Sequence, residues 1–399
     1  MRVQIKTSAR VALVGSGPAN IAIAFGLMRR GIDAKDIVVV DAKPPMGQLT
    51  RNVESIAMGE MRSGWEVNVT DNPSALRQFA GAIGKSDHSP TPSWDLFRQH
   101  SLAVWGSLGI EQLPFQAEKL ASWGDNWLVG LADDTAVLET KVVIVATGLG
   151  PHRRATINNT IALPLPDNAN ALYGGERVGI IGAGLTAAHT ALFLAKKGCH
   201  VTLFAPRGLQ TAERDAKMEW FGMSTDAHGC ASSIDPQAMQ RKLRGLRSKQ
   251  RDQFIKEGAN PGTVTPIMER SLQNLIRQGK ITVVQARISD CRRDITPGRF
   301  VPVDANGKQY GAFNLVYDAG GHSVHVDNVD RGPNRIAGLR REIGPRHFEG
   351  FPEFKDATCQ VKPGLVLAGS MTAMEYGPVA HTLAGPVAHA RHLAQALPI

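Results

Sequence analysis

Short runs of apolar residues, each followed by glycine or by an acidic residue, form the main pattern near the start of the chain. Residues 11–14 are all apolar and lead into Gly15, and residues 37–40 are all apolar and lead into Asp41. Between them, apolar residues recur at the spacing of a helix that ends near Gly31. The pattern predicts a strand, a helix and a second strand in a βαβ unit. Strands that are apolar throughout are typical of a parallel sheet covered on both faces.

The same pattern recurs once, in the middle of the chain. Residues 178–181 predict a strand, residues 187–197 a helix and residues 200–204 a second strand. Other buried strands that end at glycine are expected at residues 142–145, 315–317 and 365–368. Ligands of open α/β sheets bind at this end of the strands. We therefore predict an α/β protein with two Rossmann-like dinucleotide-binding domains.

The loop after the first strand has the spacing of a dinucleotide-binding fingerprint. Its first glycine allows a tight turn, its second lets the backbone approach a pyrophosphate, and the helix start supplies N–H groups. Asp41 is expected to accept hydrogen bonds from ribose hydroxyls. Asn20 stands at the third glycine position, where it either bonds to the local backbone or places a polar group near the cofactor. The residues predicted to bind this nucleotide are Gly15, Ser16, Gly17, Pro18, Ala19, Asn20 and Asp41.

The loop of the second unit carries the same fingerprint, but the strand that follows ends at Arg207 and not at an acid. A guanidinium binds a 2′-phosphate, which a carboxylate would repel. The second site is therefore predicted to prefer NADPH over NADH. Arg207 could also be a solvated loop residue, and Arg214 could share or replace its role. The residues predicted to bind this nucleotide are Gly182, Gly184, Leu185, Thr186 and Arg207.

The composition limits the classes of function. The chain has 399 residues, of which 43% are hydrophobic, and no window is apolar enough to span a membrane. The first ten residues are polar and basic without a signal sequence, so we expect a cytoplasmic protein. The four cysteines are widely separated and form no Cys-x-x-Cys pair, which argues against a dithiol centre. No histidine pair has the spacing of metal ligands, so no metal site is predicted.

The net charge is +9, and much of it lies in residues 241–251. A solvated helix face is one explanation. A docking patch for an acidic protein partner or a phosphorylated substrate is the other. Nucleic acid is not expected, because no aromatic residues are interleaved with the basic ones.

The order of these motifs resembles that of the two-dinucleotide-binding-domain flavoproteins over essentially the whole chain. In that family the N- and C-terminal segments together bind FAD, and an inserted middle domain binds NAD(P)H. The resemblance implies an FAD domain at residues 1–165 and 305–399. It also implies an NADPH domain at residues 170–304, which includes a helical insertion at about residues 208–275.

Several details resemble the class B, N-hydroxylating flavin monooxygenases. The motif at residues 15–20 is similar to their Gly-x-Gly-Pro-x-Asn signature, and residues 61–63 and 71–74 are similar to the stretch beside their flavin ring. Residues 375–382 resemble their Gly-Pro turn before a helix whose N-terminus faces the flavin. Further FAD contacts that the resemblance implies are Ala42, Lys43, Gln48, Met61, Ala146, Thr147, Gly148, Gly369, Ser370, Gly377 and Pro378.

The resemblance implies that NADPH reduces FAD and that a flavin C4a-hydroperoxide oxygenates a small-molecule nucleophile, at nitrogen, sulfur or carbon, in specialised metabolism. With no cysteine pair to receive electrons, O2 is the expected acceptor. The alternatives are an electron transferase of the NADPH–ferredoxin or adrenodoxin reductase type, a flavin-dependent oxidase or dehydrogenase, and a non-redox role such as a sensor.

Three polar residues are predicted to lie near the flavin ring and to act in catalysis: Arg62, His381 and His322. Arg62 stands where the monooxygenases have glutamine, and it could bind an anionic substrate or the NADP pyrophosphate. The alternative for Arg62 is a salt bridge to Glu60 or Glu66, and the alternative for His381 is a solvated residue in the first turn of a helix.

Overall fold

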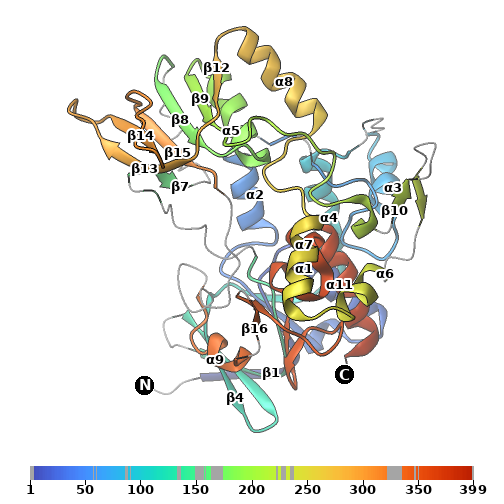
Figure 1. Cartoon of the computed structure of the whole chain (residues 1–399). Coiled ribbons are helices and arrows are strands. Elements are labelled where there is room, and N and C mark those ends of the chain that lie inside the picture. Colours follow the sequence, from blue (N-terminus) through green and yellow to red (C-terminus); the bar gives the residue numbers. More distant parts are fainter. Residues whose placement is uncertain are drawn as a thin grey trace.

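The computed structural model contains two parallel sheets, each with helices on one face and a strand hairpin on the other (Figure 1). The structure describes residues 4–56, 58–59, 61–85, 89, 91–132, 136–148, 157, 159–162, 174–221, 223–225, 231–233, 238–320, 335–345, 347–348 and 350–397.

The first sheet has the strand order β18-β19-β6-β1-β2-β3, and its strands from β19 to β3 are parallel. They are β1 (Gln4–Val14), β2 (Ile37–Val40), β3 (Glu111–Leu113), β6 (Ala136–Val145), β18 (Gln360–Lys362) and β19 (Leu365–Leu367). A hairpin of β4 (Ala117–Trp123) and β5 (Asn126–Leu131) pairs with the first half of β6. Residues 11–14 pair with residues 37–40 in register, as the predicted βαβ unit requires.

Alternate side chains of this sheet enter two separate cores. Leu13 and Ile144 point into one core, and Val14 and Val145 point into the other. The first core is closed by α1 (Pro18–Arg29), α4 (Trp94–Leu108) and α11 (Ala384–Ala396). The second is closed by the β4–β5 hairpin and α9 (Leu339–Ile343). Because side chains alternate along a strand, burial on both faces explains why these strands are apolar throughout.

The second sheet has the order β12-β9-β8-β15-β7 and is parallel. Its strands are β7 (Ile161–Ala162), β8 (Arg177–Ile181), β9 (His200–Phe204), β12 (Ile281–Val284) and β15 (Leu315–Asp318). One face is covered by α5 (Leu185–Lys196) and α8 (Pro266–Arg277). The other is covered by a hairpin of β13 (Ile288–Arg293) and β14 (Phe300–Asp304). The α/β class with two Rossmann-like units is confirmed.

Strand pairing moves the expected domain boundaries. The resemblance places the return to the FAD domain at residue 305, but residues 315–318 pair with β8 in the second sheet. It also extends the first FAD segment to residue 165, but residues 161–162 pair with β15. The predicted insertion ends before α8, because α8 packs on α5 and leads into β12. A helix of this kind is the crossover that parallel neighbours need.

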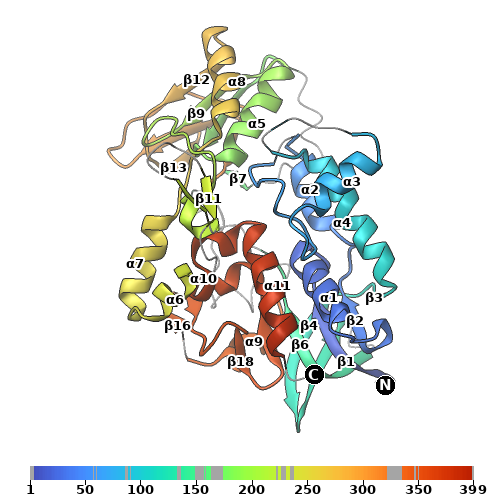
Figure 2. The ribbon, with the colours of Figure 1, turned by 90° about the vertical axis from the view of Figure 1, so that its right-hand side faces the viewer.

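The insertion lies against the C-terminal segment of the chain, as Figure 2 shows for α6, α7 and α10. It contains η4 (Met218–Phe221), β10 (Met223–Thr225), β11 (Ala231–Ser233), α6 (Ala238–Arg244) and α7 (Ser248–Gly258). Trp220 joins it to that segment, because a Cβ on either Gly258 or Gly377 would overlap the indole. The indole therefore fills a slot that two glycines leave open.

The remaining elements are short. They are α2 (Gly47–Glu54), α3 (Ala75–Ala82), α10 (Ala373–Tyr376), β16 (His347–Phe348), β17 (Phe351–Pro352), η1 (Ala34–Asp36), η6 (Gly369–Thr372) and η7 (Gly377–His381). Across the described part of the chain, no helix has both the length and the apolar character that crossing a bilayer requires.

We expect Gly258→Ala to lower the free energy of unfolding by about 1–3 kcal/mol, because its methyl group overpacks the indole slot. The control is Gly81→Ala, an exposed glycine of α3 whose Cβ would meet no atom within 4 Å. That change should raise stability by up to about 1 kcal/mol through helix propensity. Denaturant unfolding of both variants measures the difference. Equal changes in the free energy of unfolding for the two variants would contradict the close packing of the indole against Gly258.

Candidate dinucleotide sites

The first glycine turn lies at the carboxyl edge of the first sheet, where β1, β6 and β19 end side by side. The Ala146 amide donates to the Val14 carbonyl (3.0 Å), and the Ala368 amide donates to the Val145 carbonyl (2.8 Å). Gly15 has a φ of +103°, and a Cβ on it would lie 2.5 Å from the Ala146 carbonyl oxygen. Both the left-handed backbone and the close approach require glycine here.

The second glycine of this turn faces open space. Gly17 is the N-cap of α1, and Pro18 begins the helix. A Cβ on Gly17 would meet no heavy atom within 4 Å. Free space beside the N–H groups of a helix start is what a pyrophosphate needs. The turn therefore fits the diphosphate of a dinucleotide.

Asp41 connects the end of β2 to this turn. One carboxylate oxygen accepts hydrogen bonds from the Ser16 backbone N–H and hydroxyl, both at 2.8 Å, and the other accepts from the Lys43 N–H (2.9 Å). Asp41 is half-buried, so a ribose can still approach it. The carboxylate thus holds the turn in place, and its contact with ribose stays a prediction.

Asn20 bonds to the local backbone, in agreement with one of its two predicted roles. Its Nδ2 donates to the carbonyl oxygens of Val14 (2.9 Å) and Gly15 (2.7 Å). Its buried Oδ1 has no hydrogen-bond partner among the described residues. Buried acceptors are normally satisfied, so this oxygen fits a donor on a bound cofactor.

The other residues expected near the first site have mixed environments. The side chains of Lys43 and Gln48 form a hydrogen bond, and Gln48 also donates to Asn52 (2.6 Å). Ala42 is exposed. Met61 is buried in the core beneath the helical face of the sheet, which gives it a packing role.

The C-terminal segment adds a further glycine to the same sheet edge. Gly369 follows β19, has a φ of +69°, and would place a Cβ in open space. Thr147 and Gly148 follow the neighbouring strand β6 and are half-buried and exposed, respectively. Ser370 is buried. These residues lie at the strand ends where the sequence predicts the cofactor.

The helix expected after the Gly-Pro turn is different in the structure. Gly377 has a φ of +70° and Pro378 is buried, but they begin the five-residue 3-10 helix η7. The α-helix α11 starts only at Ala384. The helix that begins at this turn is therefore a short 3-10 helix, and its direction toward a flavin stays a prediction. The Trp220 indole occupies the space beside Gly377.

The second glycine turn repeats the geometry of the first. Gly182 has a φ of +128°, and a Cβ on it would lie 2.8 Å from the Ala319 carbonyl oxygen. Gly184 is the N-cap of α5, with Leu185 and Thr186 in the first helical turn. The predicted residues of the second site thus gather at the carboxyl edge of the second sheet.

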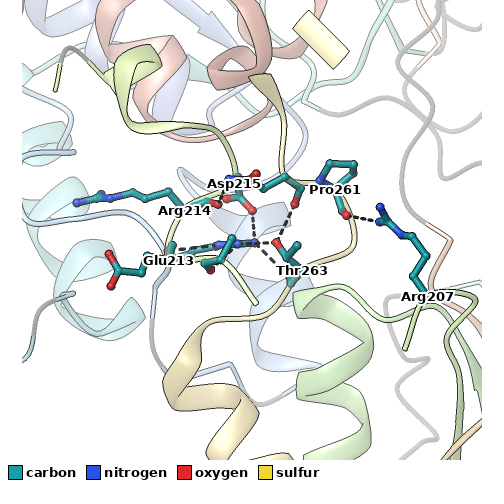
Figure 3. A network of polar contacts seen from close by, with 9 residues as sticks. Arg207, Glu213, Arg214, Asp215, Pro261 and Thr263 are labelled. Atoms are coloured by element: carbon teal, nitrogen blue, oxygen red, sulfur yellow. Dashed lines mark hydrogen bonds and ion pairs between the residues drawn. The ribbon is translucent and has the colours of Figure 1, made fainter. Parts of the chain in front are cut away.

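Arg207 follows β9 and points toward a loop of the insertion. Its Nη2 donates to the Pro261 carbonyl (2.8 Å), and its side chain is exposed. Arg214, the other candidate for a phosphate, forms an ion pair with Glu66 (3.0 Å). In Figure 3 the Arg207 side chain extends toward Pro261, and the Arg214 side chain extends away from it. Arg207 is the one that lies beside the second turn, as its contact to this loop shows.

Arg62 is buried and donates five hydrogen bonds to the insertion, whose residues Glu213, Asp215 and Thr263 are labelled in Figure 3. It donates to the Asp215 carboxylate (2.7 Å), the Thr263 hydroxyl (2.6 Å), and the carbonyls of Ala212, Glu213 and Thr263. Five is the full donor capacity of a guanidinium. Burial lowers the pKa of Arg62, and the Asp215 carboxylate opposes this shift. Arg62 therefore anchors the insertion and has no N–H left for an anionic substrate.

The two histidines predicted to act in catalysis do not form a described cluster. His381 is exposed at the end of η7, with its ring centroid 5.9 Å from that of Phe351. Its catalytic role stays a prediction. His322, and Glu60 as an alternative partner of Arg62, lie outside the described residues. Within the described ranges, no group of three His, Cys, Asp or Glu residues is placed to hold a metal ion.

Part of the basic run at residues 241–251 faces the chain itself. Arg244 forms an ion pair with the buried Glu375 (Nε to Oε1, 2.7 Å), and Arg251 donates to the Met374 carbonyl (3.4 Å). Burial raises the pKa of Glu375, and Arg244 opposes the rise. These contacts dock α6 and α7 on the C-terminal segment, a role that the charge pattern alone did not indicate. An acidic partner for this run stays a prediction.

The sequence of the two glycine turns and the strands between them matches a known family. Residues 9–219, just over half of the chain, match the pyridine nucleotide-disulphide oxidoreductases. The chain belongs to this family. No curated protein gives a significant match to the sequence. The protein is therefore an FAD- and NAD(P)H-dependent oxidoreductase.

Solved structures with the same fold include flavoproteins of different activities. An FAD-bound cadaverine monooxygenase of desferrioxamine biosynthesis from Erwinia amylovora has a TM-score of 0.74 at 12% identity, over 98% of this chain and 95% of that chain. The bacillithiol disulfide reductase from Bacillus cereus has a TM-score of 0.63 at 16% identity, over 98% and 99%. A lysine monooxygenase from Nocardia farcinica has a TM-score of 0.61 at 17% identity, over 96% and 98%.

FAD and a nicotinamide dinucleotide are the cofactors of this family, and one is expected at each glycine turn. The first turn offers open space at Gly17 and the unpartnered Oδ1 of Asn20. The second offers the start of α5 with Arg207 nearby. That FAD binds at the first turn and NADPH at the second stays a prediction from the order of the motifs.

We expect Gly17→Ala to weaken FAD binding without changing the stability of the apoprotein. The residue has φ −77° and ψ 177°, which alanine adopts, and its Cβ would meet no protein atom. The methyl group would instead occupy the space assigned to the pyrophosphate. The FAD dissociation constant of reconstituted protein should rise at least about tenfold, or 1.4 kcal/mol. An unchanged constant would place the pyrophosphate elsewhere.

Arg62→Lys should lower the free energy of unfolding by about 1–3 kcal/mol, because lysine leaves buried carbonyl acceptors without a donor. The matched control is Arg77→Lys, where an exposed guanidinium lies 4.6 Å from the Trp65 ring centroid. That change should stay within about 0.5 kcal/mol. Thermal unfolding measures both. Loss of activity in Arg62→Lys with full stability would show that Arg62 acts on the reactants.

Proposed function

We propose that the protein is an NADPH-dependent flavin monooxygenase that adds one oxygen atom of O2 to a small-molecule nucleophile. The overall reaction consumes NADPH, H⁺ and O2 and yields NADP⁺, water and the oxygenated product. Bound FAD would supply hydride acceptance from NADPH and reaction with O2. Nitrogen, sulfur and carbon nucleophiles all fit this class of reaction.

The arrangement of the cysteines carries this proposal. A flavoprotein disulfide reductase with a cysteine pair passes electrons to the disulfide that the two cysteines form, so their sulfur atoms must lie close enough to bond. Here Cys199, Cys291 and Cys359 are free thiols buried in three different hydrophobic clusters. Burial raises the pKa of all three, which disfavours the reactive thiolate. Cys230 lies outside the described residues, and no other cysteine is near it in sequence.

Two of the similar structures also support a monooxygenase. The cadaverine monooxygenase and the lysine monooxygenase both act on small amines, as their names state, and both cover nearly the whole chain. A primary amine is therefore the first substrate class to test. The bacillithiol disulfide reductase, which is equally well covered, makes disulfide reduction the main competing activity.

The chain's own residues would position the cofactors and the substrate. The first turn and Asp41 hold one nucleotide, and Arg207 lies where it can select the other. Arg62 holds the insertion against the loop after α2, and Trp220 holds it against the C-terminal segment. Such a rigid frame favours transfer between two bound cofactors, because the reacting groups are held in place before they meet.

We expect the purified protein to retain FAD, to be reduced by NADPH without oxygen, and to consume O2 on mixing with air. Stopped-flow absorbance follows the flavin, and an oxygen electrode follows uptake. Without substrate, the electrons should appear as hydrogen peroxide. Diamines, lysine and ornithine should then convert peroxide release into oxygenated product.

Three acceptors distinguish the alternatives in the same assay. Reduced protein that is inert to O2 but reduces a small disulfide would establish a disulfide reductase. Reduction of ferredoxin or cytochrome c would establish an electron transferase. A flavin that neither nicotinamide reduces would indicate a non-redox role. Each of these results would refute the monooxygenase.

A further inference from the structure

A loop of the insertion lies directly over the second glycine turn. A Cβ on Gly184 would be 3.4 Å from the Cα of Gly262, and the Gly262 carbonyl carbon and nitrogen are each 4.0 Å away. Gly184 is the N-cap of α5, where a dinucleotide pyrophosphate approaches the backbone. The chain's own backbone therefore stands in the approach to this site, in contrast with the open space at Gly17.

The base of this loop is firmly held. Asn260 donates its backbone N–H to Asp215 (2.8 Å) and its side-chain amide to Arg214 (3.0 Å), both at carbonyl oxygens. On the other side, the Thr263 hydroxyl donates to the Asn260 carbonyl (2.8 Å) and accepts from Arg62 (2.6 Å). Figure 3 shows Asp215 and Thr263 on one side of the loop and Arg207 on the other. Pro261 and Gly262, which we name the tip, lie between these anchors and take no part in them.

Arg207 holds the tip over the turn. Its Nη2 donates to the Pro261 carbonyl (2.8 Å), and a Cβ on Gly262 would lie 3.4 Å from the same nitrogen. The carbonyl is a neutral acceptor. A phosphate is a charged one, and such hydrogen bonds are about twice as strong. A 2′-phosphate would therefore outcompete Pro261 for the guanidinium.

We propose that the Pro261–Gly262 tip determines the specificity of the second site as a latch, which Arg207 holds shut and a 2′-phosphate releases. The inference rests on the assignment of the nicotinamide dinucleotide to this turn. The affinity for NADPH would rise for two reasons. Its 2′-phosphate binds Arg207, and the same contact frees the approach to Gly184. NADH must open the tip without that help, so its affinity is reduced by the fraction of closed molecules.

Arg207→Ala separates the latch from a direct phosphate contact. Dissociation constants for NADPH, NADH, 2′,5′-ADP and 5′-ADP are measured by calorimetry without oxygen on the full chain whose FAD has first been reduced with dithionite, so that no hydride transfer accompanies binding. We expect NADPH and 2′,5′-ADP to weaken at least about tenfold. NADH and 5′-ADP should bind roughly two- to tenfold more tightly, because the hydrogen bond that closes the tip is lost. A direct contact alone leaves NADH and 5′-ADP unchanged, and that result would overturn the latch.

Gly262→Ala tests the tip with Arg207 intact. Gly262 has a φ of +68°, which alanine adopts only at a cost, so the closed tip is disfavoured. Both NADPH and NADH should bind more tightly, by at most roughly five- to thirtyfold. The matched control is Gly279→Ala, in the turn between α8 and β12, which has a φ of +70° and no atom within 4 Å of a Cβ. Affinities in Gly262→Ala that are no tighter than in Gly279→Ala would contradict the proposal.

These measurements do not depend on oxygen chemistry. If wild-type protein binds neither 2′,5′-ADP nor NADPH, the assigned site and the latch both fail. If the nucleotides bind with the expected pattern but reduced protein does not use O2, the latch stands and the monooxygenase proposal fails.

Discussion

Both nucleotide sites depend on the contact between a glycine backbone and the carbonyl at the end of a neighbouring strand. A Cβ would lie 2.5 Å from the Ala146 oxygen at Gly15 and 2.8 Å from the Ala319 oxygen at Gly182. In each sheet the two strands concerned are parallel and in register, so any side chain at these positions would force their ends apart. The helix starts, Asp41 and Arg207 all take their positions from the turns that these two glycines permit.

The insertion joins the two similar dinucleotide-binding units to each other. Arg62 satisfies all its donors on residues 150 or more positions away, and Trp220 fills the slot between Gly258 and Gly377. One contact is polar and buried, the other is apolar and depends on shape. Because a buried guanidinium that loses its partners is costly, the docked position of the insertion is strongly preferred over alternatives. The same anchors set the base of the loop that reaches Gly184.

The sequence predicts those parts of the fold that local pattern determines. Residues 11–14 and 37–40 form the expected strands because apolar runs and a glycine turn specify a βαβ unit without reference to distant residues. Local pattern does not predict which strands pair with one another. Residues 315–318 belong to the second sheet because they pair with β8, and their composition does not indicate that partner. Most partners of Arg62 are backbone carbonyls, which have no signature in a sequence. Pro261 and Gly262 indicate a turn, but not what the turn covers.

The insertion is also where this chain can differ most from its family in function. Members share the two cofactors, so what distinguishes them is the final electron acceptor and the control of access to the flavin. Neither glycine turn determines which electron acceptor is used, because the geometry of each turn suits the nucleotide that it binds. The insertion contacts the C-terminal segment through Trp220 and Arg244, and it contacts the second turn through Gly262. The insertion thus contacts the regions assigned to both cofactors, and a nucleotide that moves its loop acts on the same segment that borders the C-terminal part of the chain. In a chain whose described thiols are buried apart from one another, the insertion is the part best placed to decide when, and to what, the electrons leave.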